Sequence, residues 1–151
     1  MQKKKNILQV VLTGIALGAL AGLLFAEGTV VETKTFSSPV KLTLAWTAST
    51  NGIVSQATSF YVRGEIARVV LDGTSTGATY SLTLKDSSGV DVLAGLGVGV
   101  STGAVSSIVP GVRITDSTTT NVVPFVVNDL LTLDVTVAGS NKTGTVILYV
   151  K

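Results

Sequence analysis

Apolar and polar residues alternate in short runs over most of this chain, which is the pattern of β-strands with one buried face. In the segment 79–85, Tyr80, Leu82 and Leu84 alternate with serine, threonine and lysine. The segment Leu131–Val137 repeats the alternation, with leucine or valine at every second position. We therefore expect one face of each strand to lie in a core and the other to lie near water.

After residue 27, no long stretch has the period of a helix, and runs rich in Val, Thr, Leu and Ile are bounded by Gly, Ser, Asn and Asp. These runs predict strands at Thr29–Phe36, Lys41–Thr47, Ser59–Val62, Glu65–Leu71, Thr79–Lys85, Val90–Ala94, Val105–Val109, Val112–Thr115, Val122–Val127, Leu131–Val137 and Thr143–Val150. Many short strands spaced by about ten residues favour an all-β fold, a β-sandwich or jelly-roll-like domain.

Turn and loop residues separate these strands. Asp86–Gly89 and Ala138–Asn141 have the composition of tight reversals, so we expect each to close a hairpin. Ser49–Ala57 and Gly95–Gly103 break the alternation and are expected to be exposed loops. The second of these is our candidate contact loop, and its glycines are Gly95, Gly97, Gly99 and Gly103.

The N-terminal 27 residues differ from the rest in composition. Ile7–Ala26 is a run of twenty residues without charge, and as a helix it would span about 30 Å, the hydrocarbon thickness of a bilayer. Lys3–Lys5 precede it, which favours a cytoplasmic N-terminus. The sequence thus predicts a membrane anchor helix in residues 1–27, with a lipid membrane as partner, and a single all-β domain in residues 28–151.

A cleaved signal peptide is the competing interpretation of this segment, because Ala19–Ala21 matches a small-x-small cleavage site. Cleavage there would leave an apolar stub at the new N-terminus. Gly14, Gly18 and Gly22 also fall on one face of a helix, where a second helix could approach closely. We therefore expect a retained anchor that packs through these glycines in a homo-oligomer.

Composition argues for a folded domain and against nucleic-acid binding. Hydrophobic residues make up 46% of the chain and charged residues 13%, which is unlike a disordered protein. The net charge of +2 depends on Lys3–Lys5, which are three of the eleven basic residues. The remaining eight stand singly along the chain, so the sequence predicts no basic footprint for phosphates.

The chain has no cysteine and no histidine, which excludes thiolate nucleophiles, Ser-His-Asp triads and imidazole zinc sites. Asp86 and Asp91 are the nearest carboxylate pair, but they flank a turn, where Asp usually binds local backbone amides. A calcium site from Asp86, Ser88 and Asp91 lacks the usual ligand spacing. We expect Trp46 to pack in the core with Leu42 and Leu44. No catalytic residue, metal site or cofactor is predicted, and the chain is not expected to be an enzyme.

Four segments carry a resemblance to a known group of proteins: KLTLAW (41–46), GEIARVVLD (64–72), TYSLTLKDSSGVDVLAG (79–95) and residues 130–150. In these motifs, and in their order, the chain resembles small β-rich structural proteins of bacteriophage virions, of the capsid or head-associated type. The apolar N-terminal segment is a departure from them. The resemblance, with this segment, implies a membrane-associated virion protein that ties a viral or host-derived membrane to a capsid shell and contacts other structural proteins.

Two alternatives belong to other classes. The first is a pilin-like surface or filament subunit, although Lys5-Asn6 is not the basic-glycine processing site of pilins. The second is a secreted β-sandwich binding module, located at the cell surface or outside the cell, which requires cleavage of the N-terminal segment.

Overall fold

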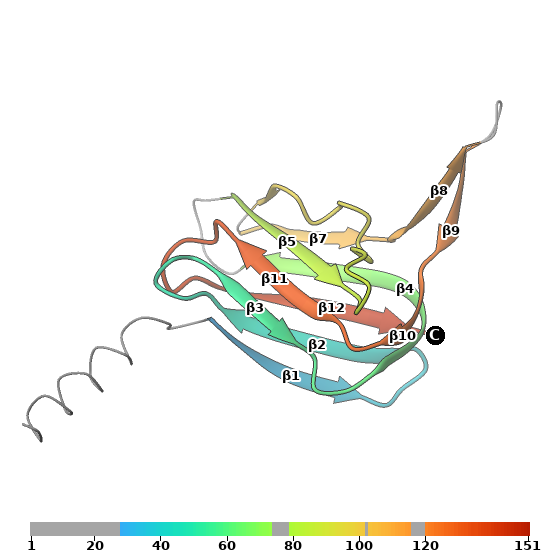
Figure 1. Ribbon diagram of the computed structural model, residues 1–151, viewed down its shortest axis with the longest axis horizontal. Coiled ribbons are helices and arrows are strands. Elements are labelled where there is room, and N and C mark those ends of the chain that lie inside the picture. The colour runs from blue at the N-terminus through green and yellow to red at the C-terminus, as the bar shows by residue number, and fades with distance from the viewer. Residues whose placement is uncertain (1–27, 74–78, 102, 116–119) are drawn as a thin grey trace, which may run out of the picture.

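The computed structural model describes residues 28–73, 79–101, 103–115 and 120–151, and the regular structure in them is entirely β-strand (Figure 1). The predicted all-β class is thus confirmed. The strands are β1 (Thr29–Thr35), β2 (Val40–Thr47), β3 (Val54–Ala57), β4 (Val62–Gly73), β5 (Thr79–Lys85), β6 (Val100–Ser101), β7 (Val105–Ile108), β8 (Gly111–Thr115), β9 (Thr120–Pro124), β10 (Val126–Asp129), β11 (Thr132–Thr136) and β12 (Thr143–Val150).

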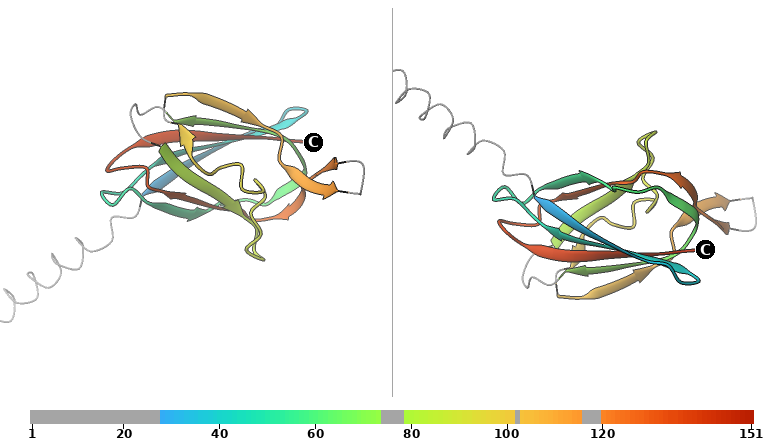
Figure 2. Two further views of the ribbon diagram at one scale, coloured as in Figure 1. Left: turned by 90° about the horizontal axis from the view of Figure 1, so that it is seen from above. Right: turned by 90° about the horizontal axis from the view of Figure 1, so that it is seen from below.

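Ten of these strands form two sheets that face each other, and the other two form a separate hairpin. The larger sheet has the order β1-β2-β12-β4-β10, with β7 also paired to β4. The smaller sheet has the order β3-β11-β5-β6. Figures 1 and 2 show the smaller sheet lying across the larger one, while the β8–β9 hairpin extends beyond both.

The core lies between the two sheets and follows the alternation of the sequence. Leu42, Leu44 and Trp46 of β2 are all buried, as predicted. The Trp46 ring meets the Tyr80 ring of the facing sheet at 5.4 Å between centroids. Each fully buried side chain of this size contributes about 1.5–3 kcal/mol relative to exposure. One predicted core position is wrong: Val137 is 73% exposed, because β11 ends at Thr136 and Val137 has a positive φ of 61°.

The predicted hairpin after β5 is only partly present. The turn forms, because the Gly89 N–H donates to the Asp86 carbonyl at 2.9 Å. Val90–Ala94 is not a strand, however, and only Asp91 bridges to Lys85. The full ladder partner of β5 is β11, far away in the sequence. A local turn therefore did not decide which strand pairs with β5.

Other connections also differ from the expectation. Ala138–Asn141 does not close a hairpin, because β11 lies in the smaller sheet and β12 in the larger. The expected loop Ser49–Ala57 contains β3, which pairs with β11. The expected strands Ser59–Val62 and Glu65–Leu71 are largely replaced by one continuous strand, β4, and the expected strand Val122–Val127 is divided between β9 and β10.

The strands define two opposite ends of the domain. Gly28 precedes β1, which pairs Thr29 with Thr47 at one end and Thr35 with Lys41 at the other. We call the end at Gly28 the proximal end, because residues 1–27 join the domain there. We call the other the distal end. It contains the β1–β2 turn and Lys151, and an eight-residue strand such as β12 separates the two ends by about 25 Å.

The β8–β9 hairpin leaves the domain at the distal end. Strand β7 runs antiparallel to β4, from Val105 opposite Asp72 to Ile108 opposite Val69. It therefore points towards the distal end, and β8 continues in that direction (Figure 1).

The predicted anchor helix, with Gly14, Gly18 and Gly22, lies outside the described residues. In the part of the chain that the structure describes, no helix has the length and hydropathy for a membrane crossing.

Candidate functional site

Aromatic rings and basic side chains gather at the distal end. Lys34 is on the inner face of β1, and its Nζ lies 5.2 Å from the centre of the Phe36 ring and 4.9 Å from that of Phe60. A cation at such distances from a ring is attracted by the ring's negative face. Phe36 is 84% exposed, so one side of this cation–aromatic cluster faces solvent.

A small cavity of about 60 Å³ opens beside this cluster. Its apolar lining comes from the distal end of the larger sheet and from the segment before β4: Val40, Leu42, Phe60, Val62 and Val150. The two cations that line it are Lys34 and Arg63. An apolar hole beside two cations is suited to a short apolar side chain next to a carboxylate. We refer to Lys34, Phe36, Phe60 and Arg63 with this cavity as the distal pocket.

Gly64 explains how Arg63 reaches the pocket. A Cβ at Gly64 would lie 2.1 Å from the carbonyl oxygen of Lys151, so only glycine allows β4 to pass so close to the end of β12. The Glu65 N–H donates to the Lys151 carbonyl at 3.0 Å. Beyond this contact the start of β4 pairs with β10 instead, and the Arg63 Nε donates to Asn128 Oδ1 at 2.8 Å.

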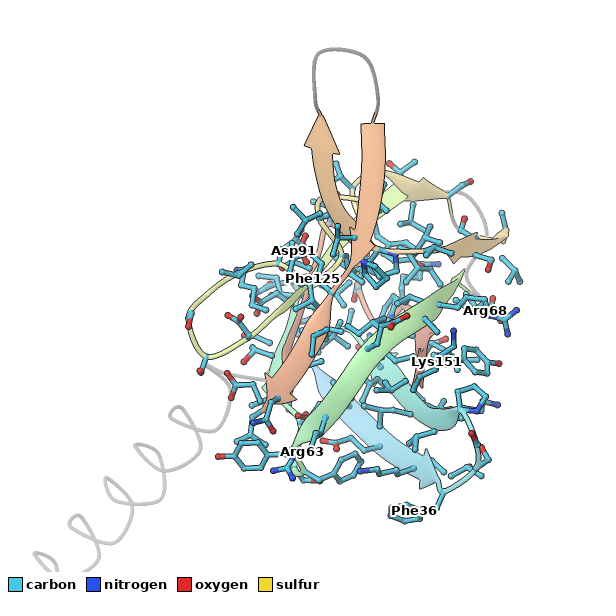
Figure 3. All side chains as sticks on the ribbon, turned by 90° about the vertical axis from the view of Figure 1, so that its right-hand side faces the viewer. Phe36, Arg63, Arg68, Asp91, Phe125 and Lys151 are labelled. Carbon is cyan, nitrogen blue, oxygen red and sulfur yellow. The ribbon has the colours of Figure 1, made fainter. Side chains whose placement is uncertain are left out.

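More positive charge lies on the outer face of the larger sheet at the same end. Lys41, Tyr149 and Arg68 are consecutive partners across β2, β12 and β4, and the Arg68 guanidinium lies 4.2 Å from the centre of the Tyr149 ring. Figure 3 shows the distal end, with Arg63, Arg68 and Lys151 on it. Among the described side chains the only ion pair is Lys85 with Asp134, so these distal cations have no carboxylate partner within 4 Å.

The predicted contact loop packs along the edge of β5. The Leu82 N–H donates to the Gly97 carbonyl at 2.8 Å, and a Cβ at Gly97 would lie 2.1 Å from the Leu82 carbonyl oxygen. Gly97 is therefore required by close backbone packing. Gly95 and Gly99 have positive φ, of 77° and 66°, at reversals of this segment. Gly103 also has a positive φ, and its N–H donates to the Gly73 carbonyl. The segment still exposes the apolar side chains of Leu96 and Val98.

Asp86 and Asp91 hold the turn between them, as the sequence indicates. Asp86 Oδ1 accepts hydrogen bonds from the N–H groups of Ser88 and Val90, both at 2.9 Å. The Asp91 carboxylate accepts from three more backbone N–H groups, of Leu84, Leu93 and Gly95. Among the described residues, no group of three or more acidic side chains could hold a metal ion.

A shallow hollow of about 320 Å³ lies on the outer face of the smaller sheet. Asp134 stands in it, accepting hydrogen bonds from Ser55 Oγ at 2.6 Å and Lys85 Nζ at 2.9 Å. Burial raises the pKa of this carboxyl, but the Ser55 hydrogen bond and the Lys85 pair outweigh it, so the pKa of Asp134 lies below its usual value. The hollow is open, and the opposite charges of Lys85 and Asp134 within it neutralise each other.

Trp46 and Tyr80 belong to the core and not to a ligand platform. Both are buried, and neither Trp46 Nε1 nor the Tyr80 hydroxyl has a hydrogen-bond partner in the described part of the chain. Burial, and secondarily the charge of Asp72, raise the pKa of Tyr80 to about 12.

An exposed strand edge can bind a partner by strand addition, but the edge of β1 is partly covered. The Val30 N–H donates to Gln56 Oε1 at 3.0 Å, and the Glu32 carboxylate accepts from the Ser59 N–H and hydroxyl. Charged side chains on the inner face of an edge strand also oppose strand addition. The edge of β1 is thus less available than the distal pocket.

The distal pocket was not predicted, because its residues stand far apart in the sequence. Lys34, Arg63 and Arg68 look like isolated charges along the chain. They come together because β1 and β12 end, and β4 begins, at the same side of the domain, which depends on strand order and direction. Strand alternation alone could have placed Lys34 on an inner face, but not beside Arg63.

Family models, curated proteins and solved structures were each compared with this chain, and none of the three comparisons finds a match. The resemblance to bacteriophage virion proteins therefore stays a prediction.

Proposed function

We propose that this chain is a non-enzymatic, membrane-anchored structural protein of a virion, in which a β-sandwich domain ties a membrane to a protein shell. The observation that carries the proposal is the placement of the two ends of the domain. The apolar N-terminal segment joins at Gly28, at the proximal end. The distal pocket and the β8–β9 hairpin lie at the opposite end.

This arrangement suits a spacer between two layers. With Ile7–Ala26 in the bilayer, the strands would hold the distal surfaces about 25 Å from the proximal end. The hairpin adds further reach, and its exposed Val112 and Val123 are direct cross-strand partners. An isolated two-stranded hairpin is only marginally stable in water, which supports a role in contact with another protein.

The absence of cysteine from the sequence permits a direct test of this orientation. The full chain is reconstituted in vesicles with a single labelled cysteine, either Asn51→Cys at the proximal end or Ser37→Cys at the distal end. A quencher attached to the lipid should reduce the fluorescence of the label at 51 more strongly than that at 37. Equal quenching, or stronger quenching at 37, would contradict the proposed orientation.

The intact mass of the mature protein tests the anchor itself. We expect the mass of a chain that retains Ile7–Ala26. A mature chain that begins at Gly22 or Glu27 would exclude the anchor and favour the secreted binding module. Capsid and packaging genes beside the coding sequence would support the virion role, whereas pilus or secretion genes would support a cellular filament.

A further inference from the structure

We propose that the outer edge of β7 binds a strand of the protein shell, so that an extended, uncharged segment of a shell protein adds to the larger sheet. The inference rests on the proposed function for the orientation of the domain, and it names the surface that the shell protein would bind. β7 lies at the margin of the larger sheet (Figure 1), and among the described residues β4 is its only strand partner.

The hydrogen bonds at the end of β4 show which backbone groups of β7 are free. The Gly103 N–H donates to the Gly73 carbonyl at 2.6 Å, so Gly73 faces the β7 side of β4. Leu71 faces the same side, because residues two apart along a strand direct their N–H and C=O groups to the same edge. Its cross-strand partner Ser106 is therefore hydrogen-bonded to β4. Ser107, the next residue, points the other way.

Val105 and Ser107 thus direct their backbone N–H and C=O groups away from the sheet. Their side chains lie on the exposed face of the strand, and Val105 is 67% exposed. Val109, just after the strand, is 60% exposed, and Pro110, which has no N–H, then limits the edge. Free backbone groups beside exposed valines form a template to which a further strand can add.

β7 also lacks the side chains that usually protect an edge. Charged residues on an edge strand oppose strand addition, but residues 92–112 include no charged residue. By contrast, β1 carries Glu32 and Lys34 on its inner face, and the contact loop covers part of β5 through the bond from Leu82 to Gly97. An uncharged edge is suited to an uncharged partner strand with small apolar residues at alternate positions.

The orientation of the domain argues against a second copy on this edge. The same residues of β7 face outwards in every copy, so two β7 strands would pair antiparallel around a two-fold axis. Because β7 runs from the proximal to the distal end, the proximal end of one copy would then lie beside the distal end of the other. Two chains anchored in one membrane in the proposed orientation cannot adopt this arrangement.

Addition of β7 to the β1 edge of a neighbouring copy would keep both chains upright. That edge is occupied, however, by the Gln56 side chain, which accepts from the Val30 N–H, and it carries the two inner charges of β1. A strand from a different protein meets neither obstacle. It would run along the axis between membrane and shell, with the β8–β9 hairpin beside its distal end.

A pair of proline variants tests the direction of the backbone groups. Ser107→Pro removes an N–H that points away from the sheet, whereas Ser106→Pro removes one that bonds to β4. In urea unfolding of the full chain in detergent, we expect Ser106→Pro to lower the midpoint by about 1 M or more and Ser107→Pro to lower it far less. Equal shifts, or a larger shift for Ser107→Pro, would contradict the assignment of the free edge.

Disulfide trapping of a probe strand tests the binding. The probe is a synthetic peptide of alternating threonine and valine with a central cysteine and a lysine at each end. In vesicles, the full chain with Ser107→Cys should form the mixed disulfide about tenfold faster than Thr33→Cys, in the middle of β1, after correction for the reactivity of each thiol with a small disulfide. Adding Val105→Lys should slow trapping at position 107 severalfold, and the matched exposed substitution Val31→Lys should not.

Photo-cross-linking identifies the occupant in assembled particles. With a photoreactive amino acid in place of Ser107, we expect a product of this chain with a shell protein, and none from the same amino acid in place of Thr33. The inference is overturned if the product joins two copies of this chain, if position 107 gives no product, if the probe reacts equally at both positions, or if Val105→Lys leaves trapping unchanged. Fluorescence quenching that still places position 37 away from the membrane would then leave the proposed function standing, so the two failures are distinguishable.

Discussion

Gly144 of β12 is the position at which one added methyl group should disturb the core most directly. A Cβ there would lie 2.3 Å from Cζ2 and 2.6 Å from Cε2 of Trp46, and 2.8 Å from the Asp72 carbonyl oxygen. The Trp46 ring is only 2% exposed and packs on Tyr80. It therefore has no free space to move into, and Gly144→Ala should overpack the contact between the two sheets.

The size of the effect follows from two opposed terms. Overpacking a well-packed core costs about 1–3 kcal/mol. Replacing glycine with alanine lowers the entropy of the unfolded chain and returns about 0.4–1 kcal/mol where the backbone allows it, and Gly144 has no positive φ. We expect a net loss of about 1–2 kcal/mol in the free energy of unfolding, which lowers the urea midpoint by about 1 M.

Urea unfolding of residues 28–151, followed by circular dichroism, measures this loss. The control is a double-mutant cycle with Trp46→Phe, which removes the ring atoms that the new methyl group would meet. The two substitutions should then be non-additive by about 1 kcal/mol or more. Our reasoning is refuted if Gly144→Ala changes the unfolding free energy by less than about 0.5 kcal/mol, or if the two changes simply add.

The other predictions concern two titrating groups and the N-terminal segment. Tyr80 has a raised pKa of about 12, so its phenol stays protonated to higher pH in the folded state than in the unfolded state. The free energy of unfolding is therefore unaffected by this group below about pH 10, and it falls by up to about 2–3 kcal/mol as the pH rises to about 12. In urea titrations at high pH, Tyr80→Phe should abolish this loss of stability, whereas Tyr61→Phe should show it in full. The same loss in both variants would contradict its assignment to Tyr80. Because the pKa of Asp134 is lowered in the folded state, its ionised carboxylate stabilises the fold above the usual carboxyl pKa, and this stabilisation is lost as the pH falls through the folded pKa. Asp134→Asn should therefore flatten the decline of stability in acid. An unchanged acid profile would count against the Lys85 pair. Gly18→Leu should weaken self-association of the full chain in detergent while strand content stays constant, because a leucine would keep the helix faces apart; unchanged association would make the glycine row incidental.

Several features of this fold could be read from the sequence because they depend on neighbouring residues alone. The alternation around Tyr80 and in β2 correctly predicted which side chains are buried. The turn Asp86–Gly89 was also correct, since its hydrogen bonds join residues at most four apart. These features are local, so they do not depend on which distant strands pair with one another.

Strand pairing was not readable in this way. β5 turns back at Asp86 but pairs with β11, because the alternation of β11 presents a second apolar face that a nearby irregular segment lacks. β3 was missed because Ser55 and Gln56 are polar, and the strand is held by its ladder with β11 and by the Gln56 contact to Val30. In both cases the partner is distant in sequence, and no local pattern identifies it.

By itself the sequence determined the all-β class, the buried face of the main strands, and the absence of thiol and imidazole chemistry, because these follow from residue type and from a period of two along each strand. Only the tertiary structure decided that Lys34, Phe60 and Arg63 share one pocket at the distal end. The physical reason is that strand order and strand direction set which ends meet. Strand order and strand direction both arise from the burial of apolar faces against strands far along the chain. Charged residues that are isolated in the sequence therefore become neighbours where the ends of those strands meet.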